Sequence, residues 1–81
     1  MKVTVRLFAR AKDLLAREHV DVEVPEPATA GDVRRALGKA YPALGTLLGR
    51  CALAVNNEFA DDSLRLPPRA EVALLPPVSG G

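Results

Sequence analysis

The first third of the chain contains two segments in which apolar and polar residues alternate. One runs from Lys2 to Phe8 and the other from His19 to Val24, and a period of two is typical of strands with one buried face. Pro25-Glu26-Pro27 ends the second segment, because proline cannot donate to a strand ladder. The inward-facing positions of these two predicted strands are Val3, Val5, Leu7, Val20, Val22 and Val24.

Helical spacing occurs in three places. Residues 10–17 predict a short helix, because apolar residues recur there at intervals of three and four. Thr29 and Asp32 form a capping-box pattern at the start of the main helix, and Pro42 prevents that helix from continuing. Residues 42–49 predict a second short helix with proline at its first position. The apolar positions are Ala11, Leu14 and Leu15 in the first helix and Val33, Ala36, Leu37, Ala40 and Tyr41 in the main helix.

The second half of the chain predicts three further strands. Residues 53–55 alternate, and Asn56-Asn57 tolerates the positive φ angles of a tight hairpin turn that leads to a short strand at Phe59. Residues 61–69 are polar and contain proline, so they predict a loop, and residues 70–75 predict the last strand. The inward-facing positions here are Leu53, Val55, Val72 and Leu74.

The order of these elements restricts the fold. A chain of 81 residues with the order strand, strand, helix, strand, short strand, strand has few compact arrangements. We therefore predict an α+β fold of the β-grasp type, in which the main helix packs on one face of a mixed sheet. Residues 1–75 are expected to form this single domain, and residues 76–81 a C-terminal tail.

Composition excludes several classes of function. Lysine and arginine number 11 against 10 acidic residues, so the chain has no electrostatic footprint for nucleic acid. No apolar run approaches the roughly 20 residues that span a bilayer, and the opening segment lacks the apolar core of a signal peptide. A lone cysteine, Cys51, cannot form an internal disulfide and fits a reducing compartment. We expect a cytoplasmic protein that binds neither nucleic acid nor membrane.

Side chains that usually carry catalysis are scarce. The chain has one histidine, His19, and no glycine-rich phosphate loop or pair of histidines at ligand spacing. We expect His19 to be structural or merely exposed, because little can be assembled around a single histidine. Cys51 precedes an apolar strand and is expected to pack as a small hydrophobic residue.

The tail Pro76-Pro77-Val78-Ser79-Gly80-Gly81 has an unusual composition. Two prolines stop the sheet and stiffen the exit, and two glycines without side chains can enter a narrow channel in another protein. The group delivered would be the carboxylate of Gly81, which with a pKa of about 3.5 is ionised at neutral pH and must be activated before it reacts as an acyl group. A frayed terminus without a function is the alternative interpretation.

Strand parity predicts an apolar patch beside this tail. Phe8 and Leu75 point away from the inward-facing positions of their strands, and the first and last strands of a β-grasp sheet are neighbours. Phe8, Leu75, Pro76 and Pro77 would then form a surface for a protein partner. The alternatives are a strand parity shifted by one residue and a short helix that covers Phe8.

These residues resemble the small, sulfur-carrying subunits of molybdopterin synthase, which are relatives of ubiquitin. The resemblance spans the chain and rests on residues 7–14 (Leu-Phe-Ala-Arg-Ala-Lys-Asp-Leu), the Ala54-Val55-Asn56-Asn57 hairpin and the ending from Glu71 to Gly81. Pro67-Pro68-Arg69-Ala70 departs from the family, whose members often have an Asp-Gly-Asp turn there. The departure affects only local turn geometry.

The resemblance implies a ubiquitin-like sulfur carrier that is not catalytic alone. An E1-like activating enzyme would use ATP to adenylate Gly81, and a sulfur donor would convert the adenylate to a thiocarboxylate. Val78, Ser79, Gly80 and Gly81 would enter the large synthase subunit, within a heterotetramer, and sulfur would pass to a cyclic pyranopterin monophosphate to build the dithiolene that binds molybdenum. The chain itself would bind no metal or other cofactor.

Other functions share these features. A sulfur carrier for thiazole formation or transfer-RNA thiolation would have the same fold, Gly-Gly ending and activation chemistry, and the lead-in Leu75-Pro76-Pro77-Val78-Ser79 favours the molybdopterin member. A ubiquitin-like modifier would instead form isopeptide bonds through Gly81. A protein-binding β-grasp module with an idle tail is the third alternative.

Overall fold

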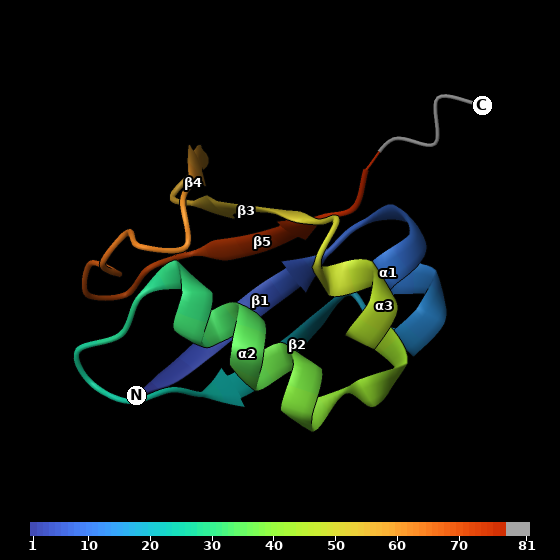
Figure 1. Ribbon diagram of the computed structural model, residues 1–81, viewed down its shortest axis with the longest axis horizontal. Coiled ribbons are helices and arrows are strands. Elements are labelled where there is room, and N and C mark those ends of the chain that lie inside the picture. Colours follow the sequence, from blue (N-terminus) through green and yellow to red (C-terminus); the bar gives the residue numbers. More distant parts are fainter. Residues whose placement is uncertain (78–81) are drawn as a thin grey trace.

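The computed structural model describes residues 1–77, which form one sheet with a layer of helices on one of its faces (Figure 1). α2 (Ala30–Ala40) is the main helix of this layer, and α1 (Ala9–Leu15) lies at one end of the layer. The strands are β1 (Lys2–Leu7), β2 (His19–Glu23), β3 (Ala52–Val55), β4 (Glu58–Ala60) and β5 (Val72–Leu75). The remaining helices are α1 (Ala9–Leu15), the 3-10 turn η1 (Pro42–Leu44) and α3 (Gly45–Leu48). The predicted α+β, β-grasp architecture is confirmed.

The five strands lie in the order β2-β1-β5-β3-β4. β1 pairs antiparallel with β2 and parallel with β5, so the first and last strands of the chain are neighbours. β3 pairs antiparallel with both β5 and β4, and the β3–β4 turn is made by Asn56 and Asn57, whose φ angles of 51° and 70° are the positive values predicted for a tight hairpin.

The core lies between the sheet and the helices. β1, β2, β3 and β5 contribute alternate residues to it, and β4 adds only the partly buried Ala60. The helical layer contributes Ala11, Val33, Leu37, Leu44 and Leu48. α2 begins with the predicted capping box: the Thr29 hydroxyl accepts from the Asp32 N–H, and the Asp32 carboxylate accepts from the Thr29 N–H at 2.9 Å. A capped α2 therefore covers one face of the sheet.

The loop between β4 and β5 is fastened to the start of α2. The N–H groups of Ala30 and Gly31 donate to the carbonyls of Leu64 and Asp62 at 2.9 and 2.8 Å. Arg34 extends this attachment, because its guanidinium donates to Asp62 at 3.1 Å and also to the carbonyls of Leu48 and Cys51. The helical layer, the loop and the start of β3 are thereby held together.

Several boundaries and side chains differ from the sequence prediction. β1 ends at Leu7 because Phe8 caps α1, its carbonyl accepting from the N–H groups of Ala11 and Lys12. β5 begins at Val72 because Glu71 bonds to the turn residue Asn56 and not to a strand. The Asn56 N–H donates to the Glu71 carbonyl, and the Glu71 N–H donates to the Asn56 side-chain oxygen. Leu14 is 41% exposed because α1 is only seven residues long and turns a narrow stripe toward the core. Ala40 lies exposed at the end of α2, where the core face has already ended.

Candidate functional site

One row of side chains crosses all five strands on the sheet face opposite the helices, on which residues 1–77 place no helix and which we call the open face. The pairing registers join His19 on β2 to Arg6 on β1, Arg6 to Ala73 on β5, Ala73 to Ala54 on β3, and Ala54 to Phe59 on β4. Directly opposite residues on a sheet point to the same face. The row is therefore charged at its β2 end and apolar at its β4 end.

A second, shorter row continues the apolar half. Leu7 pairs with Leu74 across β1 and β5, so the next residues along these parallel strands, Phe8 and Leu75, also lie side by side. Leu75 pairs in turn with Ala52 on β3. The two rows together place five apolar residues next to one another: Phe8, Ala54, Phe59, Ala73 and Leu75, which we call the apolar patch.

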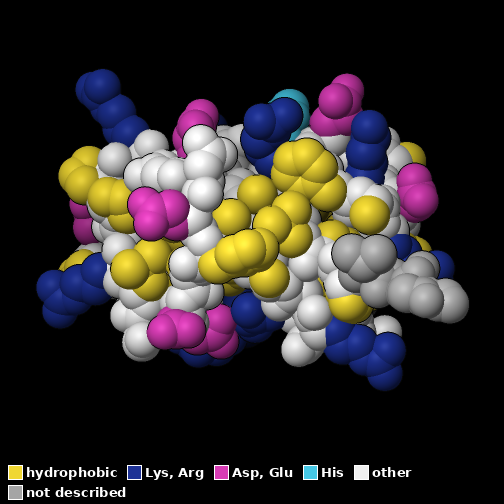
Figure 2. Space-filling model, turned by 90° about the horizontal axis from the view of Figure 1, so that it is seen from above, with side chains coloured by type: hydrophobic (Ala, Val, Ile, Leu, Met, Phe, Trp, Pro, Cys, Tyr) yellow, Lys and Arg dark blue, Asp and Glu magenta, His cyan; other side chains and the backbone are white. Residues whose placement is uncertain are grey.

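The apolar patch occupies the middle of the open face, where Figure 2 shows hydrophobic side chains gathered and charged side chains around them. Its centre is a shallow groove lined by the patch residues and by Asn57. Ala54 forms the floor and is only 8% exposed, whereas Phe59 at the rim is 80% exposed and Phe8 is 38% exposed. Small residues below and large aromatic residues above make a surface that can receive a protruding apolar side chain of another protein.

The apolar patch is contiguous with the segment that leads to the C-terminus. Leu75 is the last residue of β5, Pro76 after it is half-buried, and Pro77 is exposed. Val78, Ser79, Gly80 and Gly81, the part of the tail that is predicted to enter a partner, lie outside the described residues. A protein that covers the patch therefore contacts Leu75, three residues before Val78.

Sequence reasoning found part of this patch. The predicted parities of β1 and β5 are correct, and Phe8 and Leu75 lie together on the open face, uncovered by α1. It missed Phe59, Ala54 and Ala73 as patch residues. A two-residue turn at Asn56-Asn57 fixes the register of β3 with β4 and pairs Ala54 with Phe59, so the signal was present in the sequence.

The other candidate side chains do not form a site. Cys51 is buried, and burial raises the pKa of its thiol above the ordinary 9.0, with Arg34 opposing, so the reactive thiolate is disfavoured. His19 is exposed at the edge strand. Within residues 1–77, no three histidine, cysteine or acidic side chains are grouped as metal ligands require. None of the helices in this part of the chain has the length and apolar character to cross a bilayer.

Sequence comparison relates the whole chain to known proteins. The model of the ThiS family matches residues 5–81. The molybdopterin synthase sulfur carrier subunit of Dictyostelium discoideum is 31% identical over 95% of this chain and 93% of its own. The protein of the same name from Caenorhabditis briggsae is 34% identical over 100% of this chain and 99% of its own.

Solved structures give the same relationship. SAMP1 from Haloferax volcanii superposes with a TM-score of 0.86 at 31% identity, and the two chains cover each other completely. A complex of subunits 1 and 2 of the molybdopterin-converting factor from Helicobacter pylori contains a chain with a TM-score of 0.70 at 30% identity, again with complete mutual coverage.

Proposed function

Because the chain belongs to the ThiS family, we propose that it is the sulfur-carrier subunit of a molybdopterin synthase and that its reactive group is the carboxylate of Gly81. The observation that carries the proposal is the family match through Gly81, combined with relatives of that name across the chain. The apolar patch supports it, since a carrier needs a surface by which partners hold it next to its reactive end. We place this activity in the cytoplasm.

The chemistry begins with activation. An ionised carboxylate is a poor acyl electrophile, so an oxygen of Gly81 attacks the α-phosphorus of ATP on an E1-like enzyme, and pyrophosphate leaves. Sulfur at the sulfide level from a donor then attacks the acyl-adenylate carbon and displaces AMP, which leaves a thiocarboxylate. The thiocarboxylate sulfur bonds to a carbon of the cyclic pyranopterin monophosphate, and water then cleaves the acyl–sulfur bond, which leaves the sulfur on the pterin and restores the carboxylate. Two loaded carriers supply the two sulfurs of one dithiolene, and the carrier itself binds neither ATP nor a metal.

The large synthase subunit is the proposed partner for the apolar patch. Subunits 1 and 2 of the Helicobacter pylori molybdopterin-converting factor form a complex, and one chain of that complex resembles this chain throughout. In our proposal the large subunit covers Phe8, Phe59 and Leu75, and the residues from Pro76 and Pro77 onward lead Val78, Ser79, Gly80 and Gly81 into its active site. In this proposal the catalytic side chains come from the large subunit. Two carriers and two large subunits would make a heterotetramer.

Intact mass spectrometry tests the carrier proposal directly. The chain is incubated with its source's activating enzyme, ATP and a sulfur donor, and a gain of about 16 Da is expected, because one carboxylate oxygen is replaced by sulfur. The control is a variant that lacks Gly81, which should gain nothing. An unchanged mass for the full chain, or an equal gain in the truncated chain, would contradict the assignment of Gly81.

The identity of the product distinguishes the molybdopterin role from its relatives. The thiocarboxylated chain is mixed with the large synthase subunit and cyclic pyranopterin monophosphate, and formation of a dithiolene is expected. Sulfur delivered only to a thiazole precursor or to transfer RNA would assign the chain to those pathways instead.

Protein modification is a second candidate function. It is favoured by the similarity to a structure described as small archaeal modifier protein 1 from Haloferax volcanii, 30% identical over 95% of this chain, with a TM-score of 0.83. A modifier would form isopeptide bonds between Gly81 and lysines of other proteins. Peptide mass spectrometry of cells that express the chain would detect such adducts, and a variant lacking Gly81 should remove them.

A further inference from the structure

The charged half of the open face is not uniform along β1 and β2. At the end near the N-terminus the charges are satisfied within the chain: Lys2 lies 3.9 Å from the Asp21 carboxylate, and the Thr4 hydroxyl donates to that carboxylate at 2.7 Å. At the opposite end Arg6 faces His19 across the strand pair, with no acid directly opposite. No ion pair found among residues 1–77 includes Arg6.

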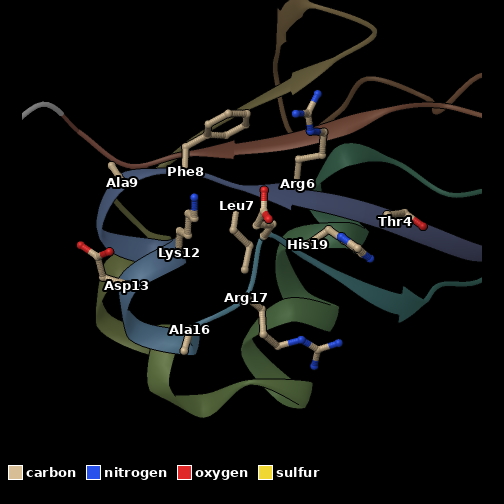
Figure 3. Close-up of a pocket in the computed structure, with 11 residues that line it drawn as sticks. Thr4, Arg6, Leu7, Phe8, Ala9, Lys12, Asp13, Ala16, Arg17 and His19 are labelled. Carbon is tan, nitrogen blue, oxygen red and sulfur yellow. The ribbon is translucent and has the colours of Figure 1, made fainter.

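Arg6 is the residue at which the charged half meets the apolar patch. It pairs with Ala73 in the register of β1 and β5, and its guanidinium carbon lies 5.5 Å from the centre of the Phe8 ring, at cation–π distance. Figure 3 shows the Arg6 and Phe8 side chains on the same side of β1, above a groove to which α1 contributes Lys12. Phe8 lines both this groove and the groove of the apolar patch.

Covering the apolar patch has a consequence for Arg6. A guanidinium is always charged and has no acceptor function, so burying it beneath a partner without a hydrogen-bond acceptor is costly. The groove holds two carboxylates, Glu18 and Asp13, but neither forms an ion pair with Arg6, Lys12 or Arg17. An acceptor for Arg6 must then come from the partner. A planar guanidinium stacked on an aromatic ring matches a carboxylate, which it can bind through two hydrogen bonds.

We propose that Arg6 is a specificity residue for partner binding, and that the protein that covers the apolar patch places a carboxylate against it. The inference rests on the proposed function, which supplies the large synthase subunit as this partner. Lys12 and Arg17, at the other sides of the groove, add to the positive potential that the partner's acidic side chain approaches.

Affinity measurements with the large subunit from the same source test this proposal. R6E is expected to weaken binding on the order of tenfold or more, because it replaces attraction by repulsion, and R6Q by several-fold. The affinity of the wild type should fall with rising salt more steeply than the affinity of R6Q, because salt screens the ion pair between Arg6 and the partner's carboxylate, which R6Q lacks. K39E is the matched control: it makes the same charge change at an exposed position of α2 and should stay within about twofold of wild type.

Zero-length carbodiimide cross-linking adds a direct readout. R6K retains the charge and supplies an amine, so its residue 6 should become joined to an aspartate or glutamate of the large subunit, identified by peptide mass spectrometry. Lys39 in the same sample should not become joined. Binding of R6E within twofold of wild type, equal losses for R6E and K39E, or no cross-link at position 6 would each overturn the proposal. If the wild-type chain itself fails to bind the large subunit, the proposed function fails and this inference with it.

Discussion

The two leucines at the end of β5 face opposite sides of the same sheet. Leu74 is fully buried against the helical layer, whereas its neighbour Leu75 is half-buried on the open face beside Phe8. Both faces carry apolar residues in rows across the strands, such as Val20, Val5, Val72 and Val55 on the covered face. Among residues 1–77, helices pack on the covered face alone.

This difference separates stability from recognition. Removing apolar area from water on the covered face contributes to the free energy of folding, while the open face retains unburied apolar area that another protein can bury. Substitutions on the covered face should therefore change the unfolding free energy, and substitutions on the open face should change affinity. The predictions below test that separation, beginning with the largest expected effect.

Leu74→Ala should lower the unfolding free energy by about 3 kcal/mol, since a fully buried leucine leaves a cavity that its neighbours only partly fill. Leu75→Ala, the matched change on the other face, should cost no more than about 1 kcal/mol. Guanidinium denaturation followed by circular dichroism measures both. Equal losses for the two variants would show that the open face also carries the fold.

Phe59→Ala should weaken binding to the large synthase subunit by about 2 kcal/mol, roughly 30-fold, because aromatic side chains that a partner buries are commonly among the few residues that dominate the binding energy. The unfolding free energy should change by no more than about 0.5 kcal/mol, as Phe59 is 80% exposed. Isothermal calorimetry and a denaturation curve give the two numbers. A stability loss as large as the affinity loss would remove the distinction between the faces.

Thr29→Ala should lower stability by about 1 kcal/mol, because the α2 cap loses its hydroxyl acceptor, and should leave affinity for the large subunit unchanged. The effect belongs to the helical cover rather than to the open face. Thermal unfolding and a binding isotherm on the same preparation measure both quantities. A changed affinity with an intact fold would mean that α2 and the open face are coupled.

Asp32 in the same cap predicts a pH dependence. The hydrogen bond from the Thr29 N–H, with that from Arg35, holds the pKa of Asp32 below its ordinary 3.8. Because the pKa of Asp32 is lower in the folded than in the unfolded state, its ionised carboxylate stabilises the fold at pH values above the unfolded-state pKa. This stabilisation is lost as the pH falls through the folded-state pKa. Stability of the wild type should therefore decline below about pH 4 more steeply than that of Asp32→Asn. Unfolding free energies measured from about pH 7 to about pH 2 for both proteins test this. The same decline below about pH 4 in the two would contradict this role of Asp32.

Arg69→Gly should give the smallest effect, a stabilisation of a few tenths of a kcal/mol up to about 1 kcal/mol. Arg69 has a φ of 57°, in the left-handed region where a side chain is unfavourable and glycine is not. The change lies in the loop before β5, away from the apolar patch, so affinity should not move. Chemical denaturation measures the gain, and a loss of stability would mean that the Arg69 side chain compensates for its backbone.

Most of the fold followed from local patterns. The alternation in β1 and β2, the Thr29–Asp32 capping box and the Asn56-Asn57 turn each depend on a few consecutive residues, and the structure confirms all three. The end of β1 was less predictable. Phe8 continues the alternation of β1, yet its carbonyl accepts the first hydrogen bonds of α1. The alternating pattern alone does not show that the helix takes this residue from the strand.

The candidate site was harder to predict because its residues come from different strands that lie side by side and not from one continuous segment of the sequence. Phe8 and Leu75 were found from parity within their own strands, but Ala54, Ala73 and Phe59 join them only through the strand order β1-β5-β3-β4. Alanine also gives a weak signal in a sequence, since its importance here lies in being small enough to form the floor of a groove. Ala54 and Ala73 belong to the apolar patch because of their positions in the sheet and not because of their residue type.

The closeness of the apolar patch to the last residue of β5 limits how the carrier can be shared. One partner seated on Phe8, Phe59 and Leu75 also occupies the approach to Pro76, so a second protein cannot take the same molecule at the same time. In the proposed cycle the activating enzyme and the large synthase subunit would bind this face in succession, and each would have to dissociate before the other could bind. Binding at this face must then be tight enough to select the carrier and short-lived enough to release it. A variant that bound one partner too tightly would slow the proposed cycle of sulfur loading and transfer.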